Sequence, residues 1–82
     1  MRLDKYLKVS RLVKRRTVAN ELCDARHVEV NGKAARASLE VKPDDEIAVQ
    51  TGPHRLRVRV LAVNEFATKE SACTMFEILE QT

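Results

Sequence analysis

The residues best able to do chemistry in this sequence are the cations of its first half. Residues 1–36 hold ten Lys and Arg against four acids, a net of +6, and residues 37–82 hold five against eight, a net of −3. The two halves account for the total of +3. Such an asymmetry indicates one face that binds a polyanion. A solvated, charged surface on a small protein would give the same counts.

Three successive cations, Lys14, Arg15 and Arg16, mark the sharpest candidate site. They stand at the start of a predicted helix, whose N-terminal end is already positive because of the helix dipole. A phosphate group would compensate, because guanidinium groups and the free N–H groups of the helix end would both converge on it. We therefore interpret these three residues as a phosphate-binding elbow between two helices.

Two polar residues near the elbow each allow two interpretations. Asp4 lies in the first turn of a predicted helix, where its charge suits the dipole, and alternatively it holds a neighbouring Arg in a fixed position. Asn20 follows Arg16 by four residues, so the two share a polar edge and could contact one stretch of backbone or base together. An ordinary exposed Asn is the equal alternative.

Length and composition argue against most other kinds of chemistry. A chain of 82 residues is one small domain, and no nucleophile–base pair or carboxylate pair is recognisable, so we expect no enzyme and no cofactor. A zinc set of Cys23, His27, His54 and Cys73 lacks the close Cys spacing of a strong motif, so we expect no metal. The two cysteines fit reduced thiols. Without a membrane-spanning run or a signal peptide, the expected location is the cytoplasm, with no membrane partner.

Two short helices must position the cations. Helical spacing predicts a helix over 3–11, with Leu3, Tyr6, Leu7 and Ser10 on the buried face and Asp4, Lys8 and Arg11 on the opposite face. Leu12 and Val13 are expected in the core. A second helix over 16–25 is predicted to bury Val18, Leu22 and Ala25, with Ala19 and Cys23 at its flank. It ends at Arg26 without the usual Gly.

Strands are predicted for most of the remaining chain. Residues 27–30 alternate and lead into the Asn31-Gly32 hairpin signal, with Lys33 and Arg36 on the return strand. Turns at 42–45 and 51–53 flank a strand over 46–49. In the strand over 55–60, Leu56, Val58 and Val60 point inward and three Arg point outward. Those Arg either extend the basic surface or, as we slightly favour, protect an exposed sheet edge.

The last segment allows a helix or a strand. Ala72, Met75, Phe76 and Leu79 recur at helical spacing from Lys69, which favours a terminal helix, whereas Thr74, Phe76 and Ile78 alternate as in a strand. The expected fold class is α+β, with two short helices packed on a small, mainly antiparallel sheet. We expect a single domain over 1–82, with a core over 1–50 and a β/α extension over 51–82.

The motifs of the first fifty residues resemble those of a known family. They comprise Arg2-Leu3-Asp4-Lys5-Tyr6-Leu7, Arg11-Leu12, Arg16-Thr17, Ala19 and Val28-x-Val30-Asn31-Gly32. Together they resemble the αL motif of the S-four family of RNA-binding domains. Within that family, residues 1–19 are most similar to the ribosome quality control factors P (RqcP), and next to the heat-shock-protein-fifteen group.

The resemblance implies a factor without chemistry of its own. Members of the RqcP group bind rRNA of the large ribosomal subunit and peptidyl-tRNA after a stalled ribosome splits, and support alanine tailing by the partner factor RqcH. A recycling role like that of the heat-shock-protein-fifteen group is the alternative. The family's RNA contacts fall on Arg2, Lys8, Arg11, Arg15, Arg16 and the turn over 31–33, with Asp4 orienting a basic neighbour. This chain departs in having Arg15 at a usual Ser or Thr cap, and Arg26 and Asp44 where Gly is commoner.

The expected ligand is structured RNA, recognised through its backbone and shape. Tyr6 is expected to be buried and Phe66 and Phe76 to lie away from the basic surface, so no aromatic platform for single strands is expected. DNA is less favoured, because the second helix carries Glu21 and Asp24, and an acidic protein partner stays open. The protein is expected to act as a monomer. The predicted RNA-binding residues are Arg2, Asp4, Lys8, Arg11, Lys14, Arg15, Arg16, Asn20, Asn31, Lys33 and Arg36.

Overall fold

A computed structural model describes residues 1–65, 68–72 and 74–82, and its first helix is shorter than predicted. Helix α1 spans Leu3–Val9 and buries Leu3, Tyr6 and Leu7. It stops before residue 11 because Ser10 caps it and Arg11 takes a left-handed conformation with φ of 64°. The prediction that Asp4 lies on the solvent face is wrong, since its side chain is only 1% exposed.

Helix α2 spans Arg16–Asp24 and turns a different face to the core than the sequence predicted. Ala19 and Cys23, expected at the flank, are the buried residues. Val18 is 39% exposed, Leu22 is half-buried and Ala25 is exposed, so these three do not form the buried stripe. The polar contacts of Arg16 and Asn20 with Asp4 on α1 explain the rotation, because they hold that edge of α2 against its neighbour.

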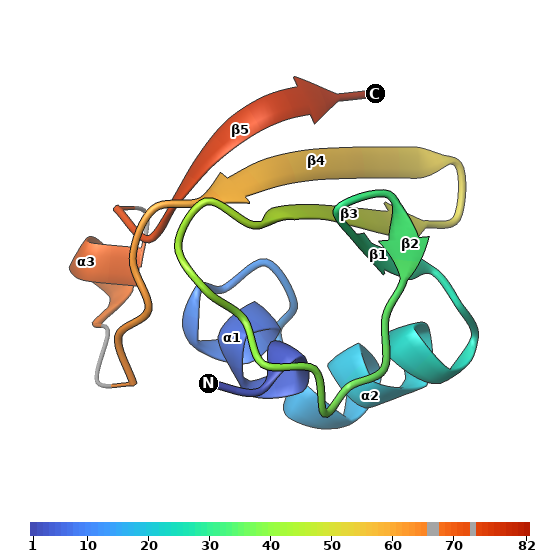
Figure 1. Cartoon of the computed structure of the whole chain (residues 1–82), viewed down its shortest axis with the longest axis horizontal. Helices are drawn as coiled ribbons and strands as arrows, with labels where there is room; N and C mark the ends of the chain where they lie inside the picture. The colour runs from blue at the N-terminus through green and yellow to red at the C-terminus, as the bar shows by residue number, and fades with distance from the viewer. Residues whose placement is uncertain (66–67, 73) are drawn as a thin grey trace.

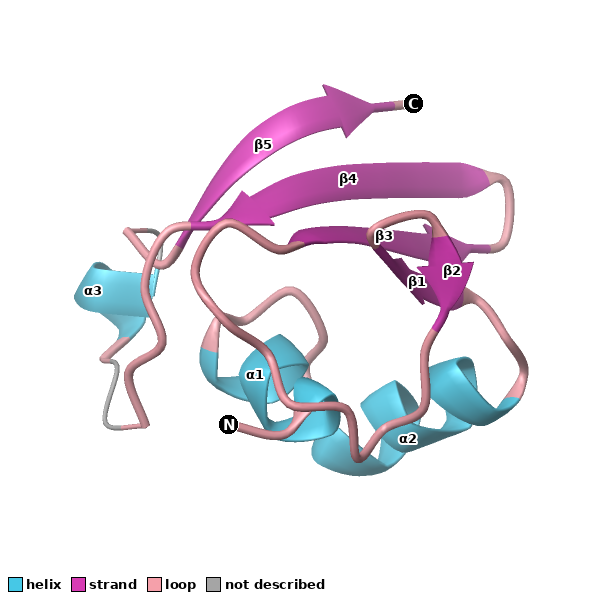
Figure 2. Ribbon diagram, viewed as in Figure 1, coloured by secondary structure: helices cyan, strands magenta, loops and turns pink. Residues whose placement is uncertain are grey.

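Five antiparallel strands form one sheet, in the order β2-β1-β3-β4-β5 (Figure 1). The strands are β1 Val28–Val30, β2 Lys33–Ala34, β3 Glu46–Thr51, β4 His54–Val60 and β5 Phe76–Gln81. The predicted hairpin joins β1 to β2, and Asn31 and Gly32 both have positive φ, as a type I′ turn requires. Figure 2 shows α1 and α2 on one face of this sheet. The core lies between them, and the residues that the sheet buries there include Val28, Ile47, Val49, Val58 and Val60.

Strand β4 lies inside the sheet, so the favoured prediction of an exposed edge is wrong. It pairs with β3 on one side and with β5 on the other. Val58 and Val60 point inward as predicted, and Arg55 and Arg57 are exposed on the outer face. The free edges of the sheet belong to β2 and β5.

The C-terminal segment is mostly strand, so the favoured prediction of a terminal helix is wrong from Phe76 onward and the alternative of a strand is confirmed. Helix α3 covers only Lys69–Ala72, and the residues from Phe76 onward lie in β5. Pairing with β4 provides backbone hydrogen bonds along one side of this segment, whereas a short isolated helix is only marginally stable in water. The Tyr6 hydroxyl, buried as predicted, donates to the carbonyl oxygen of Met75 at 2.8 Å and ties α1 to the start of this extension.

Two further findings concern the described residues only. None of their helices is long and apolar enough to cross a membrane. No group of three or more His, Cys, Asp or Glu in them could hold a metal ion. Cys73 of the considered zinc set, and Phe66, lie outside these residues.

Candidate nucleic-acid interface

Backbone contacts fix the start of α1 against a distant segment of the chain. The N–H of Leu3 donates to the carbonyl of Leu39 at 2.8 Å, and the N–H of Asp4 donates to that of Ala37 at 3.1 Å. The first N–H groups of a helix have no partner within the helix. The segment over 37–39 therefore supplies acceptors and sets the position of Asp4 in the fold.

The Asp4 carboxylate accepts five hydrogen bonds from four residues. Arg16 donates from Nε to Oδ2 at 3.1 Å and from Nη2 to Oδ1 at 3.5 Å, and Asn20 donates from Nδ2 to Oδ2 at 3.2 Å. Arg2 donates from Nε to Oδ1 at 3.3 Å, and the N–H of Lys5 donates to the same oxygen at 2.8 Å. We call Arg2, Asp4, Arg16 and Asn20 the Asp4 cluster.

The electrostatics of the cluster keep Asp4 charged. Burial of the carboxyl group tends to raise its pKa. The hydrogen bonds from Arg16 and from the N–H of Lys5, with the charges of Arg16 and Arg2, outweigh burial and hold the pKa of Asp4 below its ordinary value of 3.8. The carboxylate is therefore ionised at neutral pH and holds both guanidinium groups by charge-assisted hydrogen bonds.

The two arginines of the cluster still face solvent. The Arg16 side chain is 47% exposed and that of Arg2 is 51% exposed, whereas Asp4 is 1% exposed. Each guanidinium group thus has donors left for a ligand. Of the two interpretations of Asp4, the one in which it fixes the position of a basic neighbour is confirmed, and Asn20 is held by the same carboxylate.

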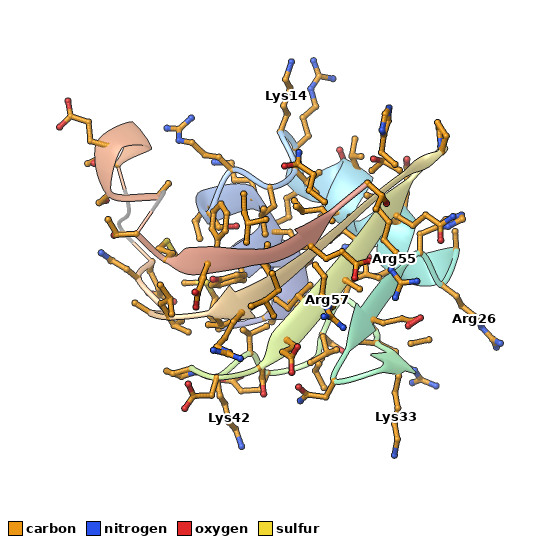
Figure 3. All side chains as sticks on the ribbon, turned by 90° about the horizontal axis from the view of Figure 1, so that it is seen from above. Lys14, Arg26, Lys33, Lys42, Arg55 and Arg57 are labelled. Atoms are coloured by element: carbon orange, nitrogen blue, oxygen red, sulfur yellow. The ribbon has the colours of Figure 1, made fainter. Side chains whose placement is uncertain are left out.

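The elbow exposes all three of its cations. Lys14, Arg15 and Arg16 are exposed, and Figure 3 shows Lys14 extending away from the loop before α2. Arg15 is the N-cap residue of α2 and makes no side-chain cap hydrogen bond, and the first turn of that helix has no acid. The first turn of α2 therefore has no negative group of its own, and the carboxylate beside it is Asp4 of α1.

A small cleft beside the elbow gathers the next predicted cations. Lys8, Arg11 and Lys14 line it together with Val9, Val13 and Glu65, and its volume is about 280 Å³. Glu65 pairs with Lys5 at 3.2 Å. The left-handed backbone of Arg11 ends α1 here, so that cations from the helix and from the elbow border one cleft.

The hairpin residues lie apart from the elbow. The Asn31 amide is used within the fold, because its Oδ1 accepts from the N–H of Glu46 at 3.0 Å and its Nδ2 donates to Asp45 at 3.2 Å. Lys33 and Arg36 border a groove of about 750 Å³ that Lys42 also lines. In Figure 3 Lys33 and Lys42 extend to the side opposite Lys14. Lys33 thus lies on a different side of the protein from the elbow.

Two cations that line grooves were not among the predicted residues, and the Cys23 thiol is free and buried. Lys42 lines the groove of the hairpin residues, and Arg26 lines a separate groove beside Arg2. The absence of Gly after the second predicted helix was the sequence feature that could have indicated a role for Arg26. Burial, with the charges of Asp4 and Asp24, raises the pKa of the Cys23 thiol to about 11. That thiol is therefore protonated at neutral pH, whereas metal binding and nucleophilic attack need the thiolate.

Comparisons with known proteins find relatives along the whole chain. The S4 domain family matches residues 1–47. A protein of Streptococcus pneumoniae named RQC P-site tRNA stabilizing factor is 46% identical over 82 residues, which cover 100% of this chain and 93% of that protein. The protein of the same name from Bacillus subtilis is 47% identical over 81 residues, which cover 99% and 94%.

Two solved structures share the fold. A trimeric heat shock protein 15 of Vibrio cholerae superposes with a TM-score of 0.89 at 23% identity, over 95% of this chain and 80% of the other. The solution structure of a hypothetical protein gives a TM-score of 0.82 at 29% identity, over 98% of each chain. Both confirm the predicted α+β class.

Proposed function

The chain belongs to the S4-domain family of RQC P-site tRNA stabilizing factors, and we propose from that membership that it stabilises peptidyl-tRNA on the large ribosomal subunit. It would act after a stalled ribosome has split, and it would contact rRNA and tRNA through the Asp4 cluster and the elbow. The observation that carries the proposal is the buried carboxylate that fixes two half-exposed arginines beside an uncapped, cationic helix end.

The physical argument points to the RNA backbone. Guanidinium groups bind phosphate with two parallel hydrogen bonds, and the free N–H groups at the start of α2 add donors and a favourable dipole. The aromatic residues that the structure describes lie elsewhere: Tyr6 is buried and Phe76 is in β5. Recognition by shape and phosphate suits structured rRNA and tRNA better than single strands.

Membership of the family also suggests the protein partner, the location and the oligomeric state. We infer that the protein works in the cytoplasm with the tailing factor RqcH, contributes no chemistry itself, and acts as a monomer. Light scattering of the free protein should give the mass of one chain, and the mass of three would overturn this inference.

The test is sedimentation of tagged protein with ribosomal particles through a gradient. Wild type should accompany the large subunit that carries peptidyl-tRNA, and Arg16→Ala should shift to the top. Arg16→Ala also removes a hydrogen bond to Asp4, so Arg15→Ala serves as a second variant. Within the described residues the Arg15 side chain makes no hydrogen bond or ion pair. Arg57→Ala, on the outer sheet face, is the matched control for loss of one charge.

Each outcome has a distinct meaning. Loss of both elbow variants from the large-subunit fraction, with Arg57→Ala retained, supports the proposal. If wild type stays at the top of the gradient in low salt, the ribosomal function is wrong. If all variants sediment like wild type, the function can stand but the site lies elsewhere.

A further inference from the structure

Helix α2 ends in a motif that normally uses glycine. The N–H of His27 donates to the carbonyl of Leu22 at 2.9 Å, and the N–H of Arg26 donates to that of Cys23 at 3.0 Å. These two bonds form a Schellman motif, in which the residue at the position of Arg26 is left-handed. Arg26 has a φ of 62°, a conformation that side chains with a Cβ disfavour. The helix end would be more relaxed with glycine.

Arg26 borders a groove that the proposed elbow contacts do not include. The groove lies between α2 and the segment over 34–38, and its volume is about 630 Å³. Its charged lining consists of Arg2, Arg26 and Arg36 against one acid, Asp24. The three arginines come from the start of the chain, from the end of α2 and from the loop after β2, so the fold brings them together.

The lining of the groove suits an extended, negatively charged ligand. Ala34, Ala35 and Ala37 contribute short side chains along it, which lets a sugar–phosphate backbone approach closely. Within residues 1–65, 68–72 and 74–82, no acid lies within ion-pair distance of Arg26 or Arg36. Figure 3 shows Arg26 extending away from the ribbon, on a different side from Lys14.

A local role for the Arg26 charge does not account for the groove. A cation near the C-terminal end of α2 interacts favourably with the helix dipole. A cation in the last turn would give the same benefit without a strained backbone, and that turn has none. The dipole also gives no reason for arginines of two other segments to border the same groove.

We propose that Arg26 binds the phosphate backbone of RNA lying in this groove, which extends the interface from the Asp4 cluster to the end of α2. The groove shares Arg2 and Asn20 with that cluster, so one RNA strand can follow both. The inference rests on the proposed RNA-binding function and adds a contact that a chain with glycine at this position lacks.

The test separates binding from backbone relaxation. Affinity for large subunits carrying peptidyl-tRNA is measured between about 50 and 200 mM salt, and the melting temperature is measured in parallel. Arg26→Gly should bind about 3- to 10-fold more weakly, with a salt slope shallower by about one, and should melt at the same or a higher temperature. Arg26→Lys should recover most of the affinity.

Two controls isolate the groove. Asp44→Gly relaxes another left-handed residue, with φ of 74°, and should raise the melting temperature without weakening binding. Arg57→Ala removes one charge from the outer sheet face and should leave the salt slope unchanged.

The outcomes distinguish this inference from the function on which it rests. If wild type binds and Arg26→Gly binds equally with the same slope, the groove contact is wrong and the proposed function stands. Equal weakening of Arg26→Gly and Arg57→Ala would point to net charge alone and would also overturn the contact. Weaker binding of Arg26→Gly to the tailing factor, with RNA binding intact, would assign the groove to a protein partner. If wild type itself does not bind, the proposed function fails first.

Discussion

The Arg16 Nε donates to the Asp4 Oδ2 at 3.1 Å and joins the first residue of α2 to the first turn of α1. The two residues are twelve positions apart in the sequence. The Asp4 side chain is buried, and the Arg16 side chain is half exposed. The bond therefore couples the packing of the two helices to the orientation of a guanidinium group that we propose to bind RNA.

Removing the Asp4 charge should weaken the packing of α1 against α2 and lower the stability of the protein. We expect Asp4→Asn to lower the free energy of unfolding by about 1–2 kcal/mol, less than for a fully buried ion pair because both arginines are half exposed. Urea unfolding of Asp4→Asn, Arg16→Gln and the double variant gives their coupling, expected at about 0.5–1 kcal/mol. Glu21→Gln, on the exposed face of α2, should change stability by less than about 0.5 kcal/mol. Strictly additive single variants would contradict the coupling.

The same carboxylate should make stability depend on acid pH. The pKa of Asp4 in the folded protein lies below 3.8 and in the unfolded chain is about 3.9, so the unfolded state binds the proton more tightly. This contribution is fully present well above pH 4 and is lost as pH falls through the folded pKa. Chemical denaturation of wild type and Asp4→Asn at pH 7, 4 and about 2.5 should show their difference shrinking toward acid. A constant difference would mean that the Asp4 charge is not what the variant removes.

Replacing Arg15 with an ordinary N-cap residue should stabilise the protein and weaken its binding to RNA. Arg15→Ser places a hydroxyl at the N-cap of α2, where it can accept from a free N–H group, and we expect a gain of about 0.5–1 kcal/mol. Loss of the guanidinium group should make the salt dependence of large-subunit binding shallower by about one. Arg15→Lys should keep the salt dependence without the gain in stability. Unchanged binding of Arg15→Ser would remove Arg15 from the interface.

Tyr6 should stabilise the protein through its hydroxyl group. Tyr6→Phe leaves the buried carbonyl of Met75 without this donor, and we expect a loss of about 1–2 kcal/mol in urea unfolding. Burial raises the pKa of Tyr6 to about 12, so its contribution is fully present below about pH 10 and falls as pH approaches 12. Tyr6 is the only tyrosine and the sequence has no tryptophan, so an ultraviolet titration of phenolate reads this residue alone. A midpoint near 10 in the folded protein would contradict its burial.

Local patterns were sufficient to predict the elements of the first sixty residues. Helical spacing located α1 and α2, and Asn31-Gly32 located the hairpin, because these depend on neighbours in sequence. The burial of Asp4 was missed, since a charged residue is assigned to solvent unless its partner is known, and the partner Arg16 lies on another helix. Pairing with the edge of β4 that β3 leaves unpaired makes the segment from Phe76 onward a strand. Periodicity within the segment does not reveal that this edge is available.

The face of α2 was mispredicted for a related reason. Val18 and Leu22 are more hydrophobic than Ala19 and Cys23, so a hydrophobicity pattern favours burying them. In the fold, the small residues face the core and the polar edge of the helix meets Asp4. The predicted cations could be assigned to one basic surface, but which of them border the same groove depends on the tertiary fold.

The contacts of Leu3 and Asp4 with the segment over 37–39 impose an order on the maturation of the protein. While the chain is being made, its cation-rich beginning emerges first, but the acceptors that fix the start of α1 follow more than thirty residues later. In the nascent chain the cations of the first half are therefore present before the segment that fixes the start of α1. Because these contacts need the later segment, the cations of the first half leave the ribosome before the contacts that position Asp4 can form.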